Sequence, residues 1–583
     1  MKKGEIVEAV CREMHYPNRG ICEIADAPVS LFPEALHENN VEQKERAEFL
    51  PSDTGVRIPA SESAADFSVS SDTAIEDEPV EIAVKNAIPG QRLSVRALRK
   101  KGGIWHGQAL SVVEKSSLED RPAGEVCPHY SECGGCLFQT LSYKNTLVVK
   151  NDEVRRLFEP VFTNGFASET FQNLYEGMVP SPDVSAYRNK MEFSFGDHEK
   201  GGPMTLGMHK RNSFYDIVTT DHCNIISADM RAILSETLHF FSERNVPYYH
   251  KNEEKGFLRH LLLREGKNTG ELLIDLVTTS QAPHSGAASE SAAGEENAAE
   301  KNKAALAGTG NPAEIEALLK AWKEAILALP LSAKVAGILH TTNDAISDAV
   351  IDQGTEVLYG EASFTDTILG INFAISPFSF FQTNTRGAEK LYSVVRNMVT
   401  DSIDNQARLI YDLYCGTGTI SQLMAAVSDR VVGVEIVPEA VEKAKENAAL
   451  NGLANCEFIC DDVFHALDSM PEKPDVMILD PPRDGVAKKA LEKILSYGVD
   501  SIVYVSCKPS SLARDIPAFH EAGYRAKKMV AVDMFPFTAQ VETVCLLSKL
   551  SEAKNHISVK VDMDEMDLTA AESKATYQEI QEW

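Results

Sequence analysis

The segment from residue 408 to 548 constrains the fold of this chain most strongly, because four short apolar strands alternate there with stretches of helical spacing. Such alternation predicts an α/β fold with a doubly wound sheet. Ligands of these sheets bind at the carboxyl ends of the strands. We therefore expect the functional residues at those ends, which are Cys415–Gly418 after RLIYDLY, Glu435 in VVGVEI, Asp480 in DVMILD and Cys507 after SIVYVS.

The turn Tyr414-Cys-Gly-Thr-Gly418 follows the first of these strands and opens a helix. Its glycines let the backbone approach a ligand closely. Glu435, at the end of the next strand, is placed to accept both hydroxyls of a ribose, as an acid does in dinucleotide folds. The third glycine of G-x-G-x-x-G is absent, since Ser421 and Gln422 stand there. This favours S-adenosylmethionine over NAD, with a purely structural turn as the alternative.

Cys507 is a candidate nucleophile. A free cysteine is most often a buried structural thiol. This one, however, ends a strand at the expected functional edge, and Lys508 with the helix beginning near Ser510 would stabilise a thiolate. Asp480 opens the sequence Asp-Pro-Pro-Arg483, in which the prolines stiffen the loop and expose the acid. We expect this loop to lie beside the cofactor and the substrate.

A second kind of site is indicated by Cys127-x5-Cys133-x2-Cys136, three thiols in ten residues with two glycines between them. The chain has eleven cysteines, an odd number, and is long enough to build its own core, so a disulfide framework is not expected. Sulfur ligands in tetrahedral sites hold zinc or an iron–sulfur cluster. A fourth ligand is needed, and Cys223 is the candidate.

The formal charge of −29 is unfavourable for a general nucleic-acid surface, since phosphates attract basic residues. Much of it comes from residues 31–79, with twelve acids and three bases, and from 551–583, with eight acids and three bases. Any RNA surface must therefore be local. Basic residues cluster at Arg92–Lys101, Arg188–Lys190 and His209–Arg211. With no apolar run of membrane length and no secretory signal, we expect a cytoplasmic protein without a membrane partner.

The chain resembles the RNA uracil-5-methyltransferase family, whose members modify ribosomal or transfer RNA. The resemblance covers about residues 120 to 550 apart from 281–312, and its N-terminal part resembles the small, OB-like β-barrel TRAM domain that binds RNA. The stretches that carry it are YRNKMEFSFG (187–196), GFLRHLLLREG (256–266), SFFQTNTRGAEKLY (379–392), DLYCGTGTI (412–420), GVEIVPEAVEKAKENAALNG (433–452), LDPPRDG (479–485), SCKPSSLARD (506–515) and DMFPFTAQVET (533–543).

This resemblance implies a role for each candidate residue. Cys507 adds to carbon 6 of uracil, and Glu542 removes the carbon 5 proton after methyl transfer. Contacts to S-adenosylmethionine come from Gln382, Tyr414, Glu435 and Asp480, with Asp462 near the adenine. The resemblance also implies a [4Fe-4S] cluster in place of zinc, held by Cys127, Cys133, Cys136 and Cys223. Together with a TRAM-like domain, that cluster favours the 23S ribosomal RNA branch.

The expected organisation is a TRAM-like barrel in 1–118 split by an acidic, disordered insertion at 31–79, and a central α+β iron–sulfur domain in 119–375 with a disordered insertion at 281–312. A Rossmann-like methyltransferase domain follows in 376–550, and then an acidic tail in 551–583. We expect a monomer.

Two residues depart from the family pattern. Gln540 stands where the family usually has His, and Lys508 where it usually has Asn or Asp. Neither change removes a group that the chemistry needs, although both are expected to affect rate or substrate placement. The alternatives are a transfer-RNA or dual-site enzyme, and a non-catalytic RNA-binding relative. The presence of both Cys507 and Glu542 argues against the last.

Overall fold

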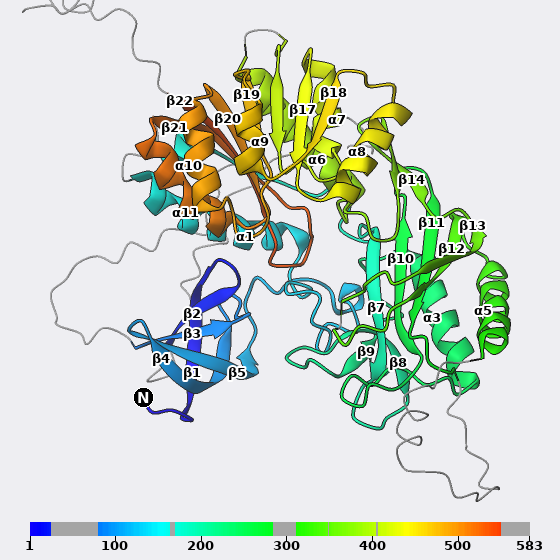
Figure 1. Ribbon diagram of the computed structural model, residues 1–583. Coiled ribbons are helices and arrows are strands. Elements are labelled where there is room, and N and C mark those ends of the chain that lie inside the picture. The colour runs from blue at the N-terminus through cyan, green and yellow to red at the C-terminus, as the bar shows by residue number, and fades with distance from the viewer. Residues whose placement is uncertain (25–79, 164–169, 284–310, 348, 404–405, 550–583) are drawn as a thin grey trace, which may run out of the picture.

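The computed structural model describes residues 1–24, 80–163, 170–283, 311–347, 349–403 and 406–549 (Figure 1). The predicted acidic insertion at 31–79 and the tail at 551–583 lie outside the described residues, as do residues 284–310 of the second insertion. The described part contains four sheets: a closed N-terminal barrel, a seven-stranded central sheet, an eight-stranded C-terminal sheet, and a two-stranded sheet of β14 (Phe364–Ile368) and β15 (Ile371–Ile375). None of its helices has the length and apolar character needed to cross a membrane.

The N-terminal barrel is closed by five strands in the order β1-β2-β3-β5-β4. Apolar residues alternate inward and form its core. Gly107 faces this core so closely that a Cβ atom there would lie 2.4 Å from Val95 Cγ1. The segments on either side of the predicted insertion at 31–79 thus form one barrel, as predicted. The identity of this barrel as a TRAM domain stays a prediction. The strands are β1 (Ile6–His15), β2 (Arg19–Ile24), β3 (Glu81–Lys85), β4 (Arg92–Lys101) and β5 (Ile104–Glu114).

The central sheet has seven strands in the order β13-β12-β11-β10-β7-β8-β9. Helices α3 (Ala228–Glu243) and α5 (Pro312–Leu327) pack against it (Figure 1). The fully buried Trp322 of α5 stacks on Phe241 of α3. Because α5 begins at Pro312, the end of the predicted 281–312 insertion is helical. The strands are β7 (Lys190–Asp197), β8 (Met204–His209), β9 (Ile217–Thr219), β10 (Leu258–Glu265), β11 (Glu271–Thr278), β12 (Lys334–Thr342) and β13 (Thr355–Gly360).

The C-terminal sheet has eight strands in the order β18-β17-β16-β19-β20-β22-β21-β6. Its first five strands are parallel, and every residue of β16, β19 and β20 is buried. Burial on both faces explains why these strands are mostly apolar in the sequence; Asp412 of β16 is a buried acid. Their ranges are β6 (Tyr175–Val179), β16 (Ile410–Leu413), β17 (Val431–Glu435), β18 (Cys456–Cys460), β19 (Val476–Leu479), β20 (Ser501–Ser506), β21 (Tyr524–Val532) and β22 (Glu542–Lys549).

Strand order reverses beside β16, which makes the doubly wound sheet that the sequence predicted. From β16 the chain adds β17 and β18 on one side, then crosses over to add β19 and β20 on the other. Ligand sites of open α/β sheets lie at such a switch point. The helices of this unit are α6 (Thr385–Asp401), α7 (Thr419–Met424), α8 (Pro438–Leu450), α9 (Val463–Ser469), α10 (Lys488–Tyr497) and α11 (Pro509–Glu521).

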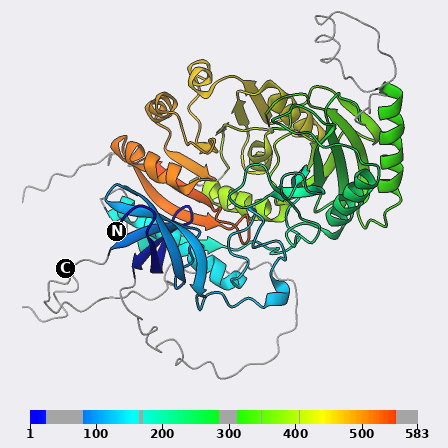
Figure 2. The ribbon, with the colours of Figure 1, turned by 90° about the horizontal axis from the view of Figure 1, so that it is seen from below.

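Two elements of the C-terminal unit come from the range predicted as the central domain. β6 extends the sheet by pairing in parallel with β21, and α1 (Tyr143–Thr163) packs on α11. The predicted start of this unit at residue 376 therefore leaves out part of it. A strand at the edge of a sheet has unpaired backbone N–H and C=O groups. Here β6 pairs with those of β21, although the two strands are far apart in the sequence. Figure 2 shows the blue barrel beside the orange strands of the same sheet.

Candidate active site

The residues predicted at the strand ends do lie along one edge of the C-terminal sheet. Leu413 pairs with Val434 on one side and with Leu479 on the other, and Leu479 pairs with Tyr504. The residues that end or follow these strands are therefore neighbours across the edge; they are Tyr414, Glu435, Asp480 and Cys507.

The Cys507 thiol is half-buried between β20 and α11. Burial raises its pKa to about 11, and the charges of Glu542 and Asp480 act in the same direction. Arg483 opposes them, because its positive charge favours the thiolate and lowers the pKa, as does its hydrogen bond to the sulfur. Lys508, the cation expected at the thiolate, instead faces Asp484 at 3.7 Å. Arg483 therefore supplies the positive charge at the sulfur.

Glu542 is the first residue of β22, and only 5% of its surface is exposed. Burial raises the pKa of its carboxyl to about 8, with a further contribution from the charge of Asp480. Val541, Phe535 and Phe537, which precede Glu542 in the chain, are buried as well. Cys507, Glu542, Asp480 and Arg483 influence one another electrostatically and are called the catalytic cluster below.

The loop that leads to Glu542 is held by a buried ion pair. Lys150 Nζ of α1 lies 2.6 Å from Asp533 Oδ1, and both side chains are fully buried. The same ammonium donates to the carbonyl oxygens of Phe535 and Gln540, each at 3.0 Å. Breaking a buried pair typically costs about 3–5 kcal/mol. Lys150 thus fixes the backbone next to Glu542.

The Gly416 turn leaves room for a ligand. The φ of Gly416 is 54°, and a Cβ atom there would meet nothing within 4 Å. Its amide donates to Glu435 Oε2 at 3.1 Å, while Glu435 Oε1 accepts from the amides of Ile436 and Val437 at 2.9 Å. These bonds hold the Glu435 carboxylate beside the open turn, where it was expected to meet a ribose.

Asp412 is a buried acid that the sequence did not mark as functional. Ser421 donates to its Oδ2 at 2.5 Å, and its Oδ1 has no hydrogen-bond partner among the described residues. Burial raises its pKa to about 7. An unsatisfied buried oxygen has a large desolvation cost, so a polar ligand group is expected to meet it.

The remaining predicted cofactor residues lie near the same edge. Gln382 hydrogen-bonds Tyr392, whose pKa is raised by burial and then by the charge of Asp480. Asp462 caps α9 by accepting from the Phe464 amide at 2.8 Å. Burial raises the pKa of Tyr414 to about 12, and the charge of Asp462 adds to this. The open turn, the held carboxylate and the unsatisfied Asp412 together fit a nucleoside cofactor.

The barrel also reaches this edge, through the turn between β1 and β2. Burial raises the pKa of the Tyr16 hydroxyl in that turn, and the charges of Cys507 and Glu542 contribute to the rise. The turn is anchored on α1, where the Asn18 amide donates to Glu153 Oε1 at 3.0 Å. The sequence places Tyr16 nearly 500 residues before Cys507 and carries no signal for this proximity.

The four predicted cluster ligands gather in one place. Cys127 and Cys223 share a hydrogen bond, which lowers the pKa of Cys127 to about 6 and raises that of Cys223. Gln139 Nε2 donates to Cys136 Sγ at 3.5 Å, and the Gly135 amide donates to Cys133 Sγ at 3.4 Å. Burial raises the pKa of Cys136 to about 11, and Cys133 and Cys127 contribute through their charges.

The spacing of these sulfurs bears on the metal that they would hold. Around one zinc ion the ligand sulfurs lie about 3.8 Å apart, given a Zn–S bond of about 2.3 Å and tetrahedral geometry. Among the described residues, no three of the four sulfurs lie within 4.8 Å of one another, although Cys127 and Cys223 are close enough to share a hydrogen bond. A set of four thiols fits either zinc or an iron–sulfur cluster.

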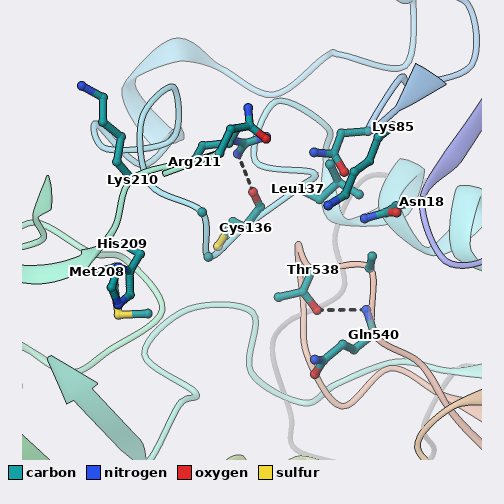
Figure 3. Close-up of a pocket in the computed structure, with 15 residues that line it drawn as sticks. Asn18, Lys85, Cys136, Leu137, Met208, His209, Lys210, Arg211, Thr538 and Gln540 are labelled. Carbon is teal, nitrogen blue, oxygen red and sulfur yellow. Dashed lines mark hydrogen bonds between the residues drawn. The ribbon is translucent and has the colours of Figure 1, made fainter. Parts of the chain in front are cut away.

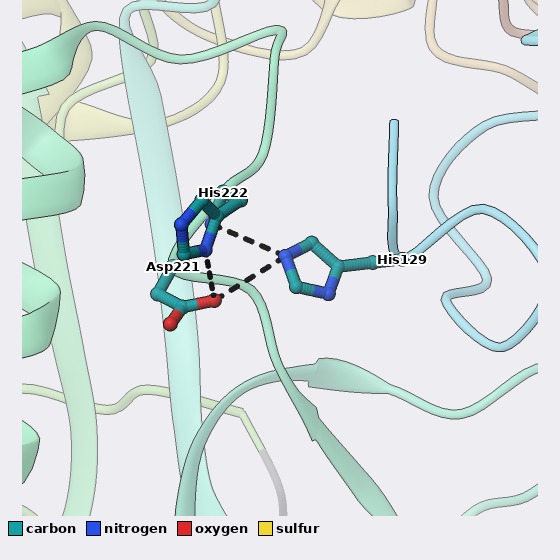
Figure 4. A group of neighbouring side chains, drawn as sticks. All are labelled: His129, Asp221 and His222. Carbon is teal, nitrogen blue, oxygen red and sulfur yellow. Dashed lines mark hydrogen bonds and ion pairs between the residues drawn. The ribbon is translucent and has the colours of Figure 1, made fainter. Parts of the chain in front are cut away.

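His129, Asp221 and His222 lie beside two of these cysteines and were not singled out in the sequence (Figure 4). His222 Nδ1 is 2.9 Å and His129 Nε2 is 3.4 Å from Asp221 Oδ1. The His222 amide donates to His129 Nε2 at 3.1 Å, so the lone pair of that nitrogen is used within the protein. The group links the loop that contains Cys127 to the segment before Cys223.

A cavity of about 430 Å³, here called the basic pocket, lies where the barrel, the cysteine loop and the loop before Glu542 meet (Figure 3). Lys85, Lys210 and Arg211 line it, and none of its described lining residues is Asp or Glu. Gln540 forms part of its wall, two residues before Glu542. The predicted basic group His209–Arg211 therefore lies beside the loop before Glu542. The basic group Arg92–Lys101 is instead on β4 of the barrel.

Comparisons with known proteins agree with this geometry. The model of the tRNA (uracil-5-)-methyltransferase family matches residues 370–550. A protein of Caldanaerobacter subterraneus subsp. tengcongensis, described as an uncharacterised RNA methyltransferase, is 43% identical over 80% of this chain and 94% of its own length. A protein of Clostridium tetani with the same description is 40% identical over 80% of this chain and 92% of its own.

One solved structure is similar over most of the chain. It is the Pyrococcus abyssi tRNA (uracil-54, C5)-methyltransferase in complex with S-adenosyl-L-homocysteine. The similarity covers 81% of this chain and 97% of that one, with a TM-score of 0.56 and 23% identity. At this identity the match is evidence for the fold.

Proposed function

The chain belongs to the RNA uracil-5-methyltransferase family, and on that basis we propose that it methylates carbon 5 of a specific uridine in 23S ribosomal RNA. The observation that carries the proposal is the catalytic cluster, in which a thiol and a buried carboxyl share Arg483 and Asp480 at the switch point of the sheet. The four-cysteine site and the N-terminal barrel support the ribosomal target. A transfer-RNA target is the second candidate, because the similar solved enzyme acts on tRNA.

In the proposed reaction, Cys507 attacks as a thiolate that is stabilised by Arg483. Its sulfur bonds to carbon 6, and the electrons of the carbon 5–carbon 6 double bond move toward O4, so that carbon 5 becomes nucleophilic. Carbon 5 then attacks the methyl carbon of S-adenosylmethionine, the second substrate, and the methyl–sulfur bond breaks so that S-adenosylhomocysteine leaves with the electron pair. Glu542 then takes the carbon 5 proton, the C–H electron pair re-forms the double bond, and Cys507 leaves as thiolate.

S-adenosylmethionine would bind along the open edge beside Gly416. The Glu435 carboxylate suits the ribose hydroxyls, and Tyr414 and Asp462 lie near enough to flank the adenine. Asp412, Asp480 and Gln382 border the same edge. Asp412 and Asp480 are both acids with raised pKa values of about 7, and acids suit a ligand that carries an ammonium and a sulfonium charge.

Cys127, Cys133, Cys136 and Cys223 would hold a [4Fe-4S] cluster with a structural role. The loop that contains three of them ends at Leu137 and Phe138, whose amides donate to the Phe537 carbonyl at 2.7 and 2.9 Å. Phe537 belongs to the loop before Glu542. Arg211, two residues after β8, ties the cysteine loop to the central sheet, because its Nη2 donates to the Cys136 carbonyl at 2.8 Å. The [4Fe-4S] cluster would thus stabilise both the loop before Glu542 and the basic pocket.

Protein purified without oxygen is expected to be brown and to contain about four irons and four sulfides per chain, by the stoichiometry of the cluster. A Cys133→Ser variant should lose most of this iron, because a ligand is removed. Cys460→Ser is the matched control, since Cys460 is an exposed thiol on β18. Iron and acid-labile sulfide are measured by colorimetric assay. One zinc and no sulfide in the wild-type protein would refute the cluster.

RNA in which the target uridine is replaced by 5-fluorouridine tests the proposed activity. Fluorine at carbon 5 cannot be removed by a base, so the reaction stops with Cys507 still bonded to carbon 6. Wild-type protein with labelled S-adenosylmethionine should give a methylated protein–RNA band on a denaturing gel. A 23S fragment and a tRNA are compared, and a band on the tRNA alone would reverse the choice of target. No band on either would contradict a uracil-5-methyltransferase.

A further inference from the structure

A second cavity, of about 510 Å³, lies next to the basic pocket. It lies in the central domain, and its walls are the end of β7, the loop before β9, and the segment around Tyr248–Glu253. We call it the aromatic pocket, because Phe214, Tyr215, Tyr248 and Tyr249 line it. His209 lines both cavities, so the two form adjacent parts of one surface.

Two rings of this pocket are exposed, although they are large and mostly apolar, whereas Tyr248 and Tyr249 are half-buried. Phe214 is 87% exposed and Tyr215 is 65% exposed. The Tyr248 and His250 rings lie 4.2 Å apart between centroids, and the Arg259 guanidinium lies 4.5 Å above the Tyr249 ring. Apolar rings gathered in water around one cavity are unusual on a protein surface and indicate a binding site.

The loop that presents Phe214 is held in place by hydrogen bonds. The Lys210 amide donates to the Asp216 carbonyl at 2.8 Å, and the Ser213 amide donates to the Lys210 carbonyl at 3.0 Å. Ser213 Oγ accepts from the amides of Tyr215 and Asp216 at 3.3 and 3.2 Å. These bonds fix the loop on both sides of Phe214. A ligand that stacks on the ring therefore does not have to order the loop, which lowers the entropic cost of binding.

The two cavities differ in charge, and each therefore suits a different part of a nucleotide. Among its described lining residues the basic pocket has no acid, so it suits phosphates. The aromatic pocket has the acids Asp197, Asp216 and Glu253 along with its cations, which disfavours phosphate. Aromatic rings stack on nucleobases, and a carboxylate accepts a hydrogen bond from an exocyclic amino group of adenine, guanine or cytosine.

We propose that the aromatic pocket binds one unstacked base of the RNA substrate, carrying an exocyclic amino group, while the backbone next to it crosses the basic pocket. The base belongs to an unpaired nucleotide near the target uridine, because the basic pocket adjoins both the aromatic pocket and the loop before Glu542. This inference rests on the proposed RNA methylation. It assigns the choice of RNA sequence to the central domain, apart from the catalytic cluster.

The test compares full-length wild-type protein with Phe214→Ala and with Tyr359→Ala, a control that removes an exposed ring on β13 of the same sheet. The expected result is a rise of about ten-fold in Kd and KM for the target RNA in Phe214→Ala, a usual loss for one stacked base. The kcat at saturating RNA should not change. Tyr359→Ala should behave as wild type, and equal melting temperatures and iron contents exclude a folding defect.

A second arm identifies the base by placing an abasic nucleotide at each unpaired position near the target in turn. At one position, the abasic nucleotide should weaken RNA binding to the wild-type protein. The Kd values of wild type and Phe214→Ala for that RNA should then be equal, because the abasic nucleotide and the Phe214→Ala substitution remove the same contact. An unchanged Kd in Phe214→Ala, or a loss that no single abasic position removes, would overturn the proposal. Wild-type protein that makes no 5-methyluridine in this assay would instead overturn the proposed function.

Discussion

A Cys507→Ala variant is expected to bind S-adenosylmethionine like the wild type and to produce no methylated RNA. Without the sulfur, carbon 5 of uracil is not activated, and no other described residue of the catalytic cluster is a comparable nucleophile. Cofactor binding should persist, because the open turn at Gly416 and the Glu435 carboxylate are formed by β16 and β17. The measurements are calorimetric binding of the cofactor and incorporation of labelled methyl groups into RNA.

The size of the loss separates covalent from non-covalent chemistry. A fall of only ten-fold is about 1.4 kcal/mol of barrier and would contradict a covalent nucleophile. Cys460→Ser is the matched control, since it removes an exposed thiol away from the cluster and should keep full activity. If Cys507→Ala also loses cofactor binding, the residue has a structural role at the sheet edge, and the assigned chemistry is wrong.

The same assignment predicts the direction of the pH dependence. The pKa of Cys507 is raised to about 11 and that of Glu542 to about 8, mainly by burial. Both groups must be deprotonated to act, and a raised pKa means that more of each is protonated at neutral pH. Adduct formation with 5-fluorouridine RNA precedes the step assigned to Glu542, so its rate should rise as pH rises toward the pKa of Cys507, and an acid optimum would contradict the thiolate mechanism.

A Glu542→Gln variant is expected to transfer the methyl group but to fail in releasing the product. Glutamine has nearly the same shape, so packing against Val541 and Phe535 should be kept, whereas its amide cannot take the carbon 5 proton. The Cys507–carbon 6 bond then has no route to break. A protein–RNA complex carrying the new methyl group should accumulate on a denaturing gel with ordinary, non-fluorinated RNA.

Three outcomes distinguish the possible roles of Glu542. Accumulation of the methylated complex identifies it as the base. Release of methylated RNA at the wild-type rate would mean that another group removes the proton. Absence of any adduct would mean that Glu542 acts earlier, in placing the uracil. Glu492→Gln, an exposed residue of α10, is the control and should turn over normally.

Much of the candidate site could be predicted from the sequence, because local pattern and topology were sufficient. Mostly apolar runs identified β16, β19 and β20, and the rule that ligands meet the carboxyl ends of parallel strands placed Cys415–Gly418, Glu435, Asp480 and Cys507 on one edge. The four cysteines that gather in the structure were likewise recognisable, three by spacing and Cys223 by the need for a fourth ligand. These inferences depend on distances along the chain, which a sequence contains directly.

Only the tertiary structure decided which charges meet. Lys150 and Asp533 are 383 residues apart, yet they form the buried pair that fixes the loop before Glu542. The cation at Cys507 is Arg483 from another strand end, although Lys508 is its neighbour in sequence, because Lys508 faces Asp484. The raised pKa of Glu542 likewise requires its burial. Electrostatic interaction and desolvation depend on distance through space and on exclusion of water, and both exist only once the chain has folded.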